Sequence, residues 1–319
     1  MSAAVLVSGA NGFVGRTVVK ALIERGDDVI GLVRRPQSDM LGVREWVLEG
    51  DGFAGIEDRW PPSYRCGSVI HLAARVHMMQ DTATDPLAAY RETNVRGTLR
   101  LAKASHAAGA QRFVFVSSVK AVGNSDHGRP LREFDQPAPN DPYGVSKLEA
   151  EQALLAYGVE SGLEIVIVRP PLVYGPGVRA NFLRLMHGIA AGVPLPLGAI
   201  PARRSMIFVG NLAHVLIQCA TDPRAAGRTF NVTDTHDLTV TELARMLAAK
   251  LNAPARFLAV PASWLRFAGT LTHKTEQVER LISSLQLDTS LICEVLNWHP
   301  PYSTEEGLSL TAAWYRSTH

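Results

Sequence analysis

The sequence predicts an α/β fold with a doubly wound parallel sheet and a smaller, mostly helical C-terminal region. Short β-branched runs alternate with longer segments of helical periodicity through the first two thirds of the chain, as expected where helices connect parallel strands. The strand candidates are mostly continuous apolar runs, which indicates a sheet covered on both faces. After Pro170 the composition shifts toward Pro, Gly and irregular apolar stretches, and this shift marks the second region.

The elements follow in chain order. We expect strands at 4–8, 28–34, 46–49, 68–73, 112–117 and 164–169, and helices at 12–25, 86–108 and 143–161. In the second of these helices Pro86 suits the first turn, after Asp85 as a candidate N-cap. Beyond Pro170 we expect a helix at 211–221, a strand at 229–233, and helices at 239–251, 274–285 and 304–315. Residues 1–170 with about 205–235 then form the sheet domain, and about 171–204 with 236–319 form the second region.

Composition and cysteine usage exclude several classes of protein. The chain has 319 residues, of which 46% are apolar and 19% charged, with a formal net charge of +2. These values exclude disorder, collagen and coiled coil, and they give no reason to expect a nucleic-acid or membrane partner. Cys66, Cys219 and Cys293 show no CxxC spacing, so neither disulfides nor a metal site is expected. Without a long apolar N-terminal segment, we expect a cytoplasmic protein.

A glycine-rich turn follows the first strand directly and opens the first helix. It reads Gly9-Ala10-Asn11-Gly12-Phe13-Val14-Gly15. Glycines here permit a tight turn and let the backbone approach a pyrophosphate, whose charge meets free N–H groups at the helix N-terminus. The spacing differs from GxGxxG, but its position between strand and helix predicts a dinucleotide-binding, Rossmann-type domain. The alternative is an ordinary glycine-rich turn.

The end of the second strand bears on which dinucleotide binds. An acidic residue there would hold the ribose hydroxyls of NAD, whereas a basic one accepts the extra phosphate of NADP. The strand ends Leu32-Val33-Arg34-Arg35, without a carboxylate and with two guanidiniums suited to a phosphate. NADP(H) is therefore preferred, and NAD(H) stays open if the arginines are a solvated pair. Asp51 is a candidate adenine contact. His71 could line the cofactor or be a hydrogen-bonded core histidine.

A tyrosine and a lysine stand four residues apart in Tyr143-Gly144-Val145-Ser146-Lys147, and Ser118 ends the fifth strand. On a helix this pair shares a face, so Lys147 can favour the Tyr143 phenolate and bring the phenol pKa closer to neutrality. Such a phenol suits general acid–base transfer, and Ser118 would hydrogen-bond the reacting oxygen. A YxxxK spacing alone would usually be a surface pair. Combined with the nucleotide turn and the serine, it predicts catalysis.

Together these motifs resemble the extended, sugar-nucleotide-modifying branch of the short-chain dehydrogenase/reductase superfamily, related to UDP-galactose 4-epimerase. The resemblance covers nearly the whole chain and is carried by residues 9–15, 71–74, 94–98, 115–118, 143–147 and 169–176. It implies catalytic roles for Ser118, Tyr143 and Lys147. The cofactor contacts expected from the motifs and the resemblance are Gly9, Asn11, Gly12, Phe13, Val14, Gly15, Arg34, Arg35, Asp51, Leu72, Ala73, Ala74, Asn94, Val116, Tyr143, Lys147, Pro170 and Val173. The resemblance also implies a UDP-sugar substrate, with candidate contacts at Arg75, Ser118, Lys120, Tyr143, Asn181, Phe182, Arg204 and Arg280.

The same resemblance reduces the number of candidate reactions. In the 4,6-dehydratases of this branch an acidic pair follows the catalytic Ser or Thr, but Val119 and Lys120 follow Ser118 here, so dehydration lacks its acid and base. Hydride transfer at a sugar carbon remains. Because a reductase exchanges NADPH whereas an epimerase typically keeps NAD bound, Arg34 and Arg35 favour reduction. Segments 73–79, 118–120, 180–182 and 203–205 look like bacterial 4-ketoreductases of O-antigen (lipopolysaccharide) synthesis.

Those ketoreductases convert a UDP-2-acetamido-2,6-dideoxy-4-keto-hexose to UDP-N-acetylquinovosamine or its 4-epimer, and this reaction is the one we expect. The first alternative is a 4-epimerase of UDP-N-acetylglucosamine or UDP-glucose with tightly bound NAD. The second is a non-catalytic regulator that senses NADP. The resemblance also implies a homodimer formed through helices 86–108 and 143–161. Met78 and Met79 could pack on a sugar, although filling of a core or loop is the simpler interpretation.

Overall fold

The computed structural model describes residues 4–36, 42–76, 85–234, 236–273 and 275–319, and its centre is a seven-stranded sheet. The strand order is β10-β6-β5-β4-β1-β2-β3, and neighbouring strands are parallel. The order changes direction between β1 and β4, the switch point at which sheets of this kind bind ligands. The predicted doubly wound parallel sheet is thus confirmed. Its strands are β1 (Ala4–Ser8), β2 (Val29–Val33), β3 (Arg44–Val47), β4 (Cys66–His71), β5 (Arg112–Val116), β6 (Glu164–Arg169) and β10 (Thr229–Asn231).

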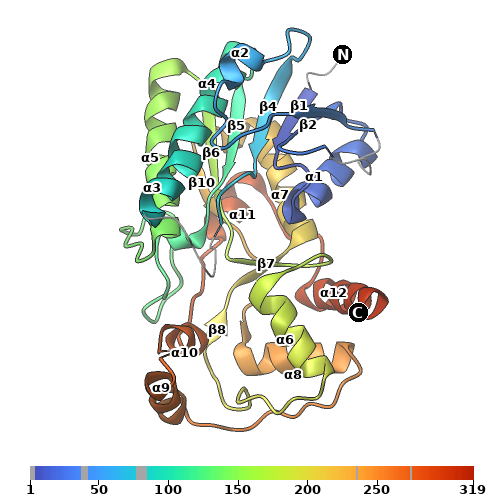
Figure 1. Cartoon of the computed structure of the whole chain (residues 1–319), viewed down its shortest axis with the longest axis vertical. Coiled ribbons are helices and arrows are strands. Elements are labelled where there is room, and N and C mark those ends of the chain that lie inside the picture. Colours follow the sequence, from blue (N-terminus) through green and yellow to red (C-terminus); the bar gives the residue numbers. More distant parts are fainter. Residues whose placement is uncertain (1–3, 37–41, 77–84, 235, 274) are drawn as a thin grey trace.

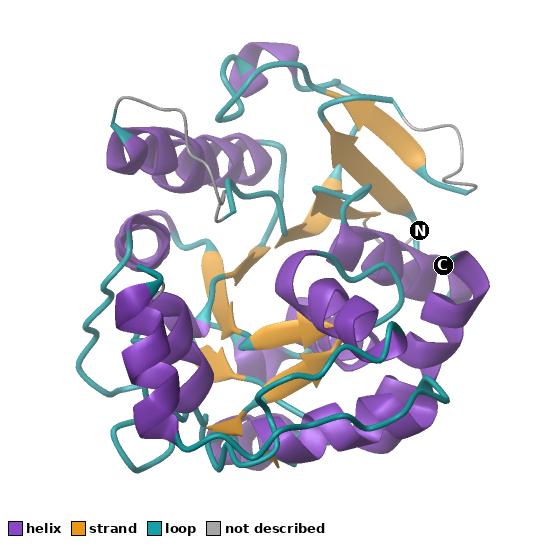
Figure 2. Ribbon diagram, turned by 60° about the horizontal axis from the view of Figure 1, so that its bottom comes forward, coloured by secondary structure: helices purple, strands orange, loops and turns teal. Residues whose placement is uncertain are grey.

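Helices cover both faces of this sheet (Figures 1 and 2). On one face α1 (Phe13–Glu24), α7 (Val209–Thr221) and α11 (Ser290–Leu296) share an apolar core with the strands. On the other face α2 (Ile56–Arg59), α4 (Thr98–Ala107) and α5 (Pro142–Ser161) do the same. Burial on both faces explains why the five residues of β1 and the five of β2 are all buried.

The helix predicted over 86–108 contains a wider turn. α3 (Pro86–Arg91) continues into a π-helical segment (Glu92–Gly97) and then into α4. Asp85 caps the start of α3 as expected, because its carboxylate accepts a hydrogen bond from the N–H of Ala88 at 3.0 Å. At the far end of the π segment a Cβ on Gly97 would lie 2.9 Å from Cα of Gly52, so glycine allows the close approach of the two backbones.

The second region lies beyond the sheet, at the lower end of the molecule in Figure 1. Its core is formed by apolar residues that include Phe182, Met186, Leu247 and Leu308. Within the described ranges of the chain, no helix is both long enough and apolar enough to cross a bilayer. Apart from α7, β10 and α11, the strands and α-helices that follow β6 are β7 (Leu172–Tyr174), α6 (Ala180–Ala190), β8 (Arg203–Arg204), β9 (Met206–Phe208), β11 (Leu238–Thr239), α8 (Val240–Lys250), α9 (Ala262–Leu271), α10 (Thr275–Ile282) and α12 (Thr304–Thr318).

Three features of this region differ from the sequence-based prediction. α6 and α9 form in segments for which we expected no helix. The helix expected over 274–285 ends earlier, at Ile282, and Lys274 lies outside the described residues. The assignment of 236–319 to the second region does not hold for α11, which packs on the sheet because Ile292, Leu296 and Trp298 are buried in its core. Trp298 also donates a hydrogen bond from its indole Nε1 to Nδ1 of His214 on α7, at 3.0 Å.

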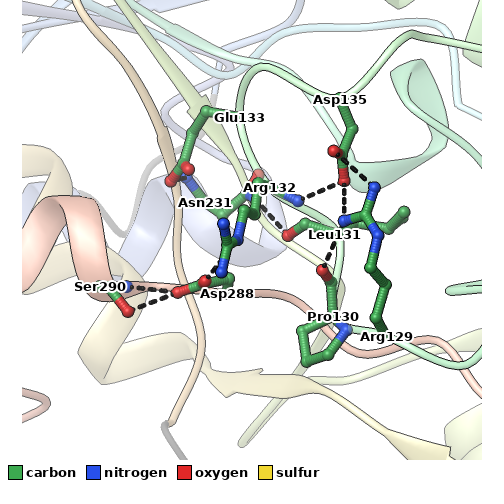
Figure 3. Close-up of polar contacts among 9 residues, drawn as sticks. All are labelled: Arg129, Pro130, Leu131, Arg132, Glu133, Asp135, Asn231, Asp288 and Ser290. Carbon is green, nitrogen blue, oxygen red and sulfur yellow. Dashed lines mark hydrogen bonds and ion pairs between the residues drawn. The ribbon is translucent and has the colours of Figure 1, made fainter.

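The long connection between β5 and α5 is held against the edge of the sheet (Figure 3). Arg132 forms an ion pair with Asp288 at 3.1 Å, next to the start of α11. The backbone N–H of Asn231, on β10, donates to the Glu133 carboxylate at 2.9 Å, and the Asn231 amide donates to the Leu131 carbonyl at 3.0 Å. This connection runs from the carboxyl end of β5 to the start of α5, and these contacts anchor its middle part to β10 and to the segment before α11.

Candidate active site

The glycine turn between β1 and α1 has the tight geometry expected of a pyrophosphate cradle. Gly9 has φ +70°, and a Cβ there would lie 3.0 Å from the backbone nitrogen of Ala73. A Cβ on Gly15 would lie 2.1 Å from the Gly9 carbonyl oxygen, so neither position accepts a side chain. The N-cap of α1 is Gly12, which has no side chain to occupy the free N–H groups of the first turn. These N–H groups and the helix dipole suit a bound diphosphate.

Beside this turn, His71 at the end of β4 is a core residue. It is 1% exposed, and its two ring nitrogens bond Ser8 Oγ at 2.5 Å and Thr98 Oγ1 at 2.9 Å. Burial lowers its pKa to about 3, so the ring is neutral at physiological pH. The core alternative for His71 therefore fits the structure. The N–H groups of Leu72 and Ala73 also donate to Ser8 Oγ, at 3.2 and 3.3 Å, and fix the chain that borders the glycine turn.

Ser118 and Tyr143 meet at the carboxyl end of β5. Ser118 follows the strand and caps a 3₁₀ turn (Val119–Ala121) by accepting a hydrogen bond from the N–H of Lys120 at 3.2 Å. Tyr143 lies in the first turn of α5, and its phenol is hydrogen-bonded to the Ser118 side chain. Two groups that are 25 residues apart in the sequence thus lie close enough for Ser118 to act on the pKa of the Tyr143 phenol.

Lys147 lies one helical turn beyond Tyr143 and is 2% exposed. Its ammonium donates to the Val116 carbonyl at 2.7 Å and lies 4.3 Å from the Phe115 ring centroid and 6.0 Å from that of Tyr143. Burial lowers the pKa of Lys147 to about 7, against the attraction of Glu151 one turn further on. Lys147 is therefore held by the strand that carries Ser118, on the same face of α5 as the phenol.

The pKa of Tyr143 departs from the expected direction. We expected Lys147 to lower it, but burial raises the pKa of Tyr143 above its ordinary value. The charge of Asp141 and the nearby Tyr90 raise it further, and only the hydrogen bond from Ser118 acts in the opposite sense. The expectation was wrong because the four-residue spacing of Tyr143 and Lys147 indicates that a cation is near the phenol. It does not indicate how strongly burial disfavours the phenolate. Tyr143 in this state keeps its proton at neutral pH.

Asn94, which we expected to contact the cofactor, forms hydrogen bonds within the protein instead. It lies in the π-helical segment, is 1% exposed, and its amide donates to Ser146 Oγ at 2.9 Å and to the Arg75 carbonyl at 3.1 Å. Its oxygen accepts from the Arg75 N–H at 2.8 Å. Asn94 therefore joins the chain after β4 to α5. The wide π turn presents this side chain toward both partners, and such turns often occur at functional sites.

At the end of β2 the predicted phosphate-binding and adenine-binding residues contact each other. Arg34 Nη1 lies 3.1 Å from Asp51 Oδ1, and the side chains are 76% and 78% exposed. Arg35 is exposed too. An ion pair this open contributes roughly 0–1 kcal/mol, so a ligand could exchange with either partner at little cost.

On the other side of Tyr143, Lys120 and Asp141 form an ion pair. Lys120 Nζ lies 2.6 Å from Asp141 Oδ2, and Asp141 Oδ1 caps α5 by accepting from the Gly144 N–H at 2.8 Å. Sequence reasoning missed Asp141, although it precedes Pro142 just as the recognised cap Asp85 precedes Pro86. It also missed Tyr90, whose ring lies 6.2 Å from that of Tyr143 and 5.5 Å from the Arg75 guanidinium carbon.

The remaining predicted substrate contacts lie in the second region. Arg204, on β8, is half-buried, and its buried Nη2 has no hydrogen-bond partner among the described residues. Burial lowers the pKa of its guanidinium, and Asp126 acts in the opposite sense. Arg280 pairs with Glu276 and borders a cavity of about 320 Å³ between α10 and the loop after Ser118, lined also by Asn124 and Asn140.

Two further expectations for this region have different outcomes. Asn181 is exposed in the first turn of α6. Phe182 is 3% exposed and stacks on Tyr174 with ring centroids 5.6 Å apart. It faces the apolar core because it lies on the inward face of α6, so the structure does not support its assignment to the substrate.

The predicted cofactor contacts Pro170 and Val173 follow β6, where the Pro170 carbonyl accepts a hydrogen bond from the N–H of Val119 at 3.0 Å. Met78 and Met79 lie outside the described residues.

Comparison with known proteins agrees with this geometry. The sequence profile described as the NAD dependent epimerase/dehydratase family matches residues 5–233. A UDP-glucose 4-epimerase from Vibrio cholerae is 39% identical over 315 residues, covering 98% of this chain and 95% of that protein. The crystal structure of UDP-glucose 4-epimerase from Thermotoga maritima with UDP-glucose matches with a TM-score of 0.81 at 25% identity, covering 98% of this chain and 99% of that one.

A second solved structure, MoeE5 in complex with UDP-glucose and NAD, matches with a TM-score of 0.77 at 27% identity, covering 99% of each chain. The family profile spans well over half of the sequence, from the glycine turn through the Ser118, Tyr143 and Lys147 positions to β10. The chain therefore belongs to the NAD dependent epimerase/dehydratase family.

Proposed function

We propose that the protein is an NADP(H)-dependent 4-ketoreductase. Its substrate would be a UDP-2-acetamido-2,6-dideoxy-4-keto-hexose, and its product UDP-N-acetylquinovosamine or the 4-epimer. The observation that carries the proposal is the hydrogen bond between Ser118 and a protonated Tyr143, with Lys147 one turn away. A phenol that retains its proton is suited to protonate an oxygen on which negative charge develops.

The bound nicotinamide would supply the hydride to the sugar carbon. Tyr143 would give its proton to the C4 oxygen, and Ser118 would hydrogen-bond the same oxygen and orient the carbonyl. Lys147 would stabilise the phenolate left behind, since its ammonium lies 6.0 Å from the Tyr143 ring and is held in place by the Val116 carbonyl. Because the fold already holds Lys147 beside the Tyr143 ring, little reorganisation of these side chains is needed at the moment of transfer.

The cofactor would be held by the glycine turn, whose tight backbone geometry is possible because Gly9 and Gly15 lack a Cβ. Arg34 would exchange its exposed partner Asp51 for the 2′-phosphate of NADP, with Arg35 beside it, and Asp51 would then be free to approach the adenine. A phosphate dianion offers a guanidinium a stronger, charge-assisted contact than an exposed carboxylate does.

The UDP part of the substrate would engage the second region. Arg204 Nη2 is buried without a hydrogen-bond partner among the residues described, and a buried guanidinium donor left unpaired is costly. A diphosphate oxygen would satisfy that donor. Arg280 and the exposed amide of Asn181 are further candidates for this half of the substrate.

Dehydration fits the site poorly. The residue two positions after Ser118 is Lys120, and its ammonium is bound to Asp141, the carboxylate that caps the Tyr143 helix. A carboxylate held by an ammonium and a helix N-terminus has a pKa below its usual range, so at neutral pH it is ionised and has no proton to donate as a general acid. Hydride transfer without elimination is therefore the reaction that we propose.

A second candidate function is 4-epimerisation of a UDP-sugar with tightly bound NAD. The observations that favour it are the 39% identity to the UDP-glucose 4-epimerase of Vibrio cholerae and the NAD in the matching MoeE5 structure. A non-catalytic NADP sensor is less well supported, because sensing does not require the contact between Ser118 and Tyr143.

The test is incubation of the purified protein with UDP-N-acetylglucosamine and, separately, with its 4-keto-6-deoxy derivative plus NADPH. NADPH absorbance and product NMR are followed, with Tyr143→Phe as the control. We expect NADPH loss with the keto sugar alone, and nearly none in the variant. Interconversion of gluco and galacto sugars without added cofactor would instead establish the epimerase. Cofactor binding without turnover of either sugar would establish the sensor.

We also propose that the protein is a homodimer that pairs through the α3–α4 segment and α5. The supporting observation is that Leu155 and Val159 of α5 are 38% and 91% exposed. Light scattering after size exclusion should give twice the chain mass, and Val159→Lys should shift it toward the monomer.

A further inference from the structure

Lys120 contacts both the turn after Ser118 and the start of α5. Its N–H donates to Ser118 Oγ at 3.2 Å, and its ammonium lies 2.6 Å from Asp141. Its carbonyl borders α5 so closely that a Cβ on Gly144 would lie 2.4 Å from it. Lys120 therefore contacts the serine on one side and the helix that carries the tyrosine on the other.

Asp141 completes this connection from the α5 side. Its Oδ1 accepts from the Gly144 N–H at 2.8 Å and its Oδ2 accepts from Lys120 Nζ, so one carboxylate holds the first turn of α5 to the turn after β5. The two side chains are 25% and 10% exposed, so water screens this pair less than it screens an open surface pair.

We propose that Lys120 and Asp141 are a positioning pair that sets the contact between the Ser118 and Tyr143 hydroxyls and balances the negative charge next to the phenol. The proposal rests on the proposed function in one respect only, namely that Tyr143 exchanges a proton with the sugar oxygen. It also replaces the expectation that Lys120 contacts the substrate, because the ammonium of Lys120 already has a partner within the protein.

The pair of Lys120 and Asp141 also affects how easily Tyr143 forms a phenolate, because charged groups surround this phenol. From α5 itself the phenol faces Lys147 and Asp141, from α3 it faces Tyr90, and Arg280 of α10 acts on Asp141. The Asp141 charge disfavours the phenolate, and Lys120 is the cation in direct contact with that charge. Without Lys120, the Asp141 carboxylate would lose its directly bonded counter-charge, its repulsion of the Tyr143 phenolate would strengthen, and phenolate formation would become harder.

The experiment compares Lys120→Met, Lys120→Arg, Asp141→Asn and the double variant Lys120→Met/Asp141→Asn. The readout is the pH dependence of kcat in the direction of sugar oxidation, where Tyr143 must lose its proton, at saturating cofactor and UDP-sugar. Lys20→Met on α1 is the matched control, because Lys20 is 75% exposed and pairs with the exposed Glu24 of the same helix.

We expect Lys120→Met to shift the apparent pKa of the profile upward by about one pH unit, a tenfold smaller phenolate fraction at a given pH. Lys120→Arg should keep the wild-type profile, since it keeps the charge. In the double variant the apparent pKa should move most of the way back to the wild-type value, because Asn caps a helix nearly as well as Asp and carries no charge. A Lys120→Met variant with a raised KM and an unchanged profile would overturn the proposal, as would a double variant that does not recover.

A second readout does not depend on the reaction. Amide hydrogen exchange of the segment 142–150 should speed up in Lys120→Met and not in Lys20→Met, because the first turn of α5 loses its anchor. Unchanged exchange would overturn the positioning role. If wild type turns over none of the sugars yet the exchange result holds, the proposed function fails and the positioning pair stands.

Discussion

The ion pair between Glu151 and Arg169 gives a sharp test of how α5 is held on the sheet. Arg169 donates to the two carboxylate oxygens of Glu151 at 2.9 and 2.5 Å, and the side chains are 7% and 2% exposed. Glu151→Gln keeps the shape but leaves a buried guanidinium without its counter-charge. Breaking such a pair costs about 3–5 kcal/mol, a large share of the roughly 5–15 kcal/mol by which a domain is stable.

Urea unfolding followed by far-UV circular dichroism measures this loss. Glu24→Gln is the control, because Glu24 pairs with Lys20 at 3.7 Å with both side chains mostly exposed, and its loss should cost less than about 0.5 kcal/mol. The double variant Glu151→Leu/Arg169→Met removes both charges and should cost less than Glu151→Gln alone. If Glu151→Gln costs no more than Glu24→Gln, the argument from burial is wrong.

Three further predictions concern the site. Gly144→Ala should lower kcat at least tenfold with little change in cofactor affinity, since its Cβ would displace α5 from the Lys120 carbonyl, whereas Gly188→Ala, where a Cβ meets only the Leu195 side chain at 3.6 Å, should not. Arg34→Ala should weaken NADPH binding about 10–100-fold, measured by fluorescence titration, because it removes a charge-assisted contact. An equal loss for NADH would contradict the assignment to the 2′-phosphate. Lys147 should make the free energy of unfolding rise with pH from about pH 7, because its pKa is about 7 in the fold and the unfolded lysine still binds a proton there. Above about pH 8.5 the buried Cys66 and Cys219, whose pKa values burial raises, act in the opposite sense. Lys147→Met should lose that slope, and a slope equal to that of wild type would contradict the buried pKa.

The fold class could be predicted because the sheet is buried on both faces. β1 and β6 form over 4–8 and 164–169 as expected, since an apolar run covered on both sides leaves few other conformations. α6 was not predicted, because we read residues 170–201, with their many Pro and Gly residues, as irregular. The packing of α6 into the core of the second region also explains why Phe182 does not reach the surface.

Those parts of the candidate site that depend on the spacing of residues along a helix or on the ends of strands could be predicted from the sequence. Tyr143 and Lys147 share a helix face because they are four residues apart, and Ser118 meets them because strand ends meet at one edge of a sheet. The pair of Lys120 and Asp141 joins positions whose separation of 21 residues has no structural period, so the sequence could not indicate it. The pKa of Tyr143 depends on burial, which is a property of the whole fold rather than of one motif.

The π-helical turn at Glu92–Gly97 restricts how the length of this helix can change. A π turn holds one residue more than an α turn, so removing a residue would let the backbone return to ordinary α-helical geometry. Because that return absorbs the lost residue locally, α3 and α4 would keep nearly the same faces toward the protein. A deletion in the first turn of α4 would instead rotate one part of the helix against the other by about 100°. Either Asn94 would leave Arg75 and Ser146, or Leu101 would leave the sheet. A single-residue deletion in α4 should therefore be far more damaging than one in the π turn.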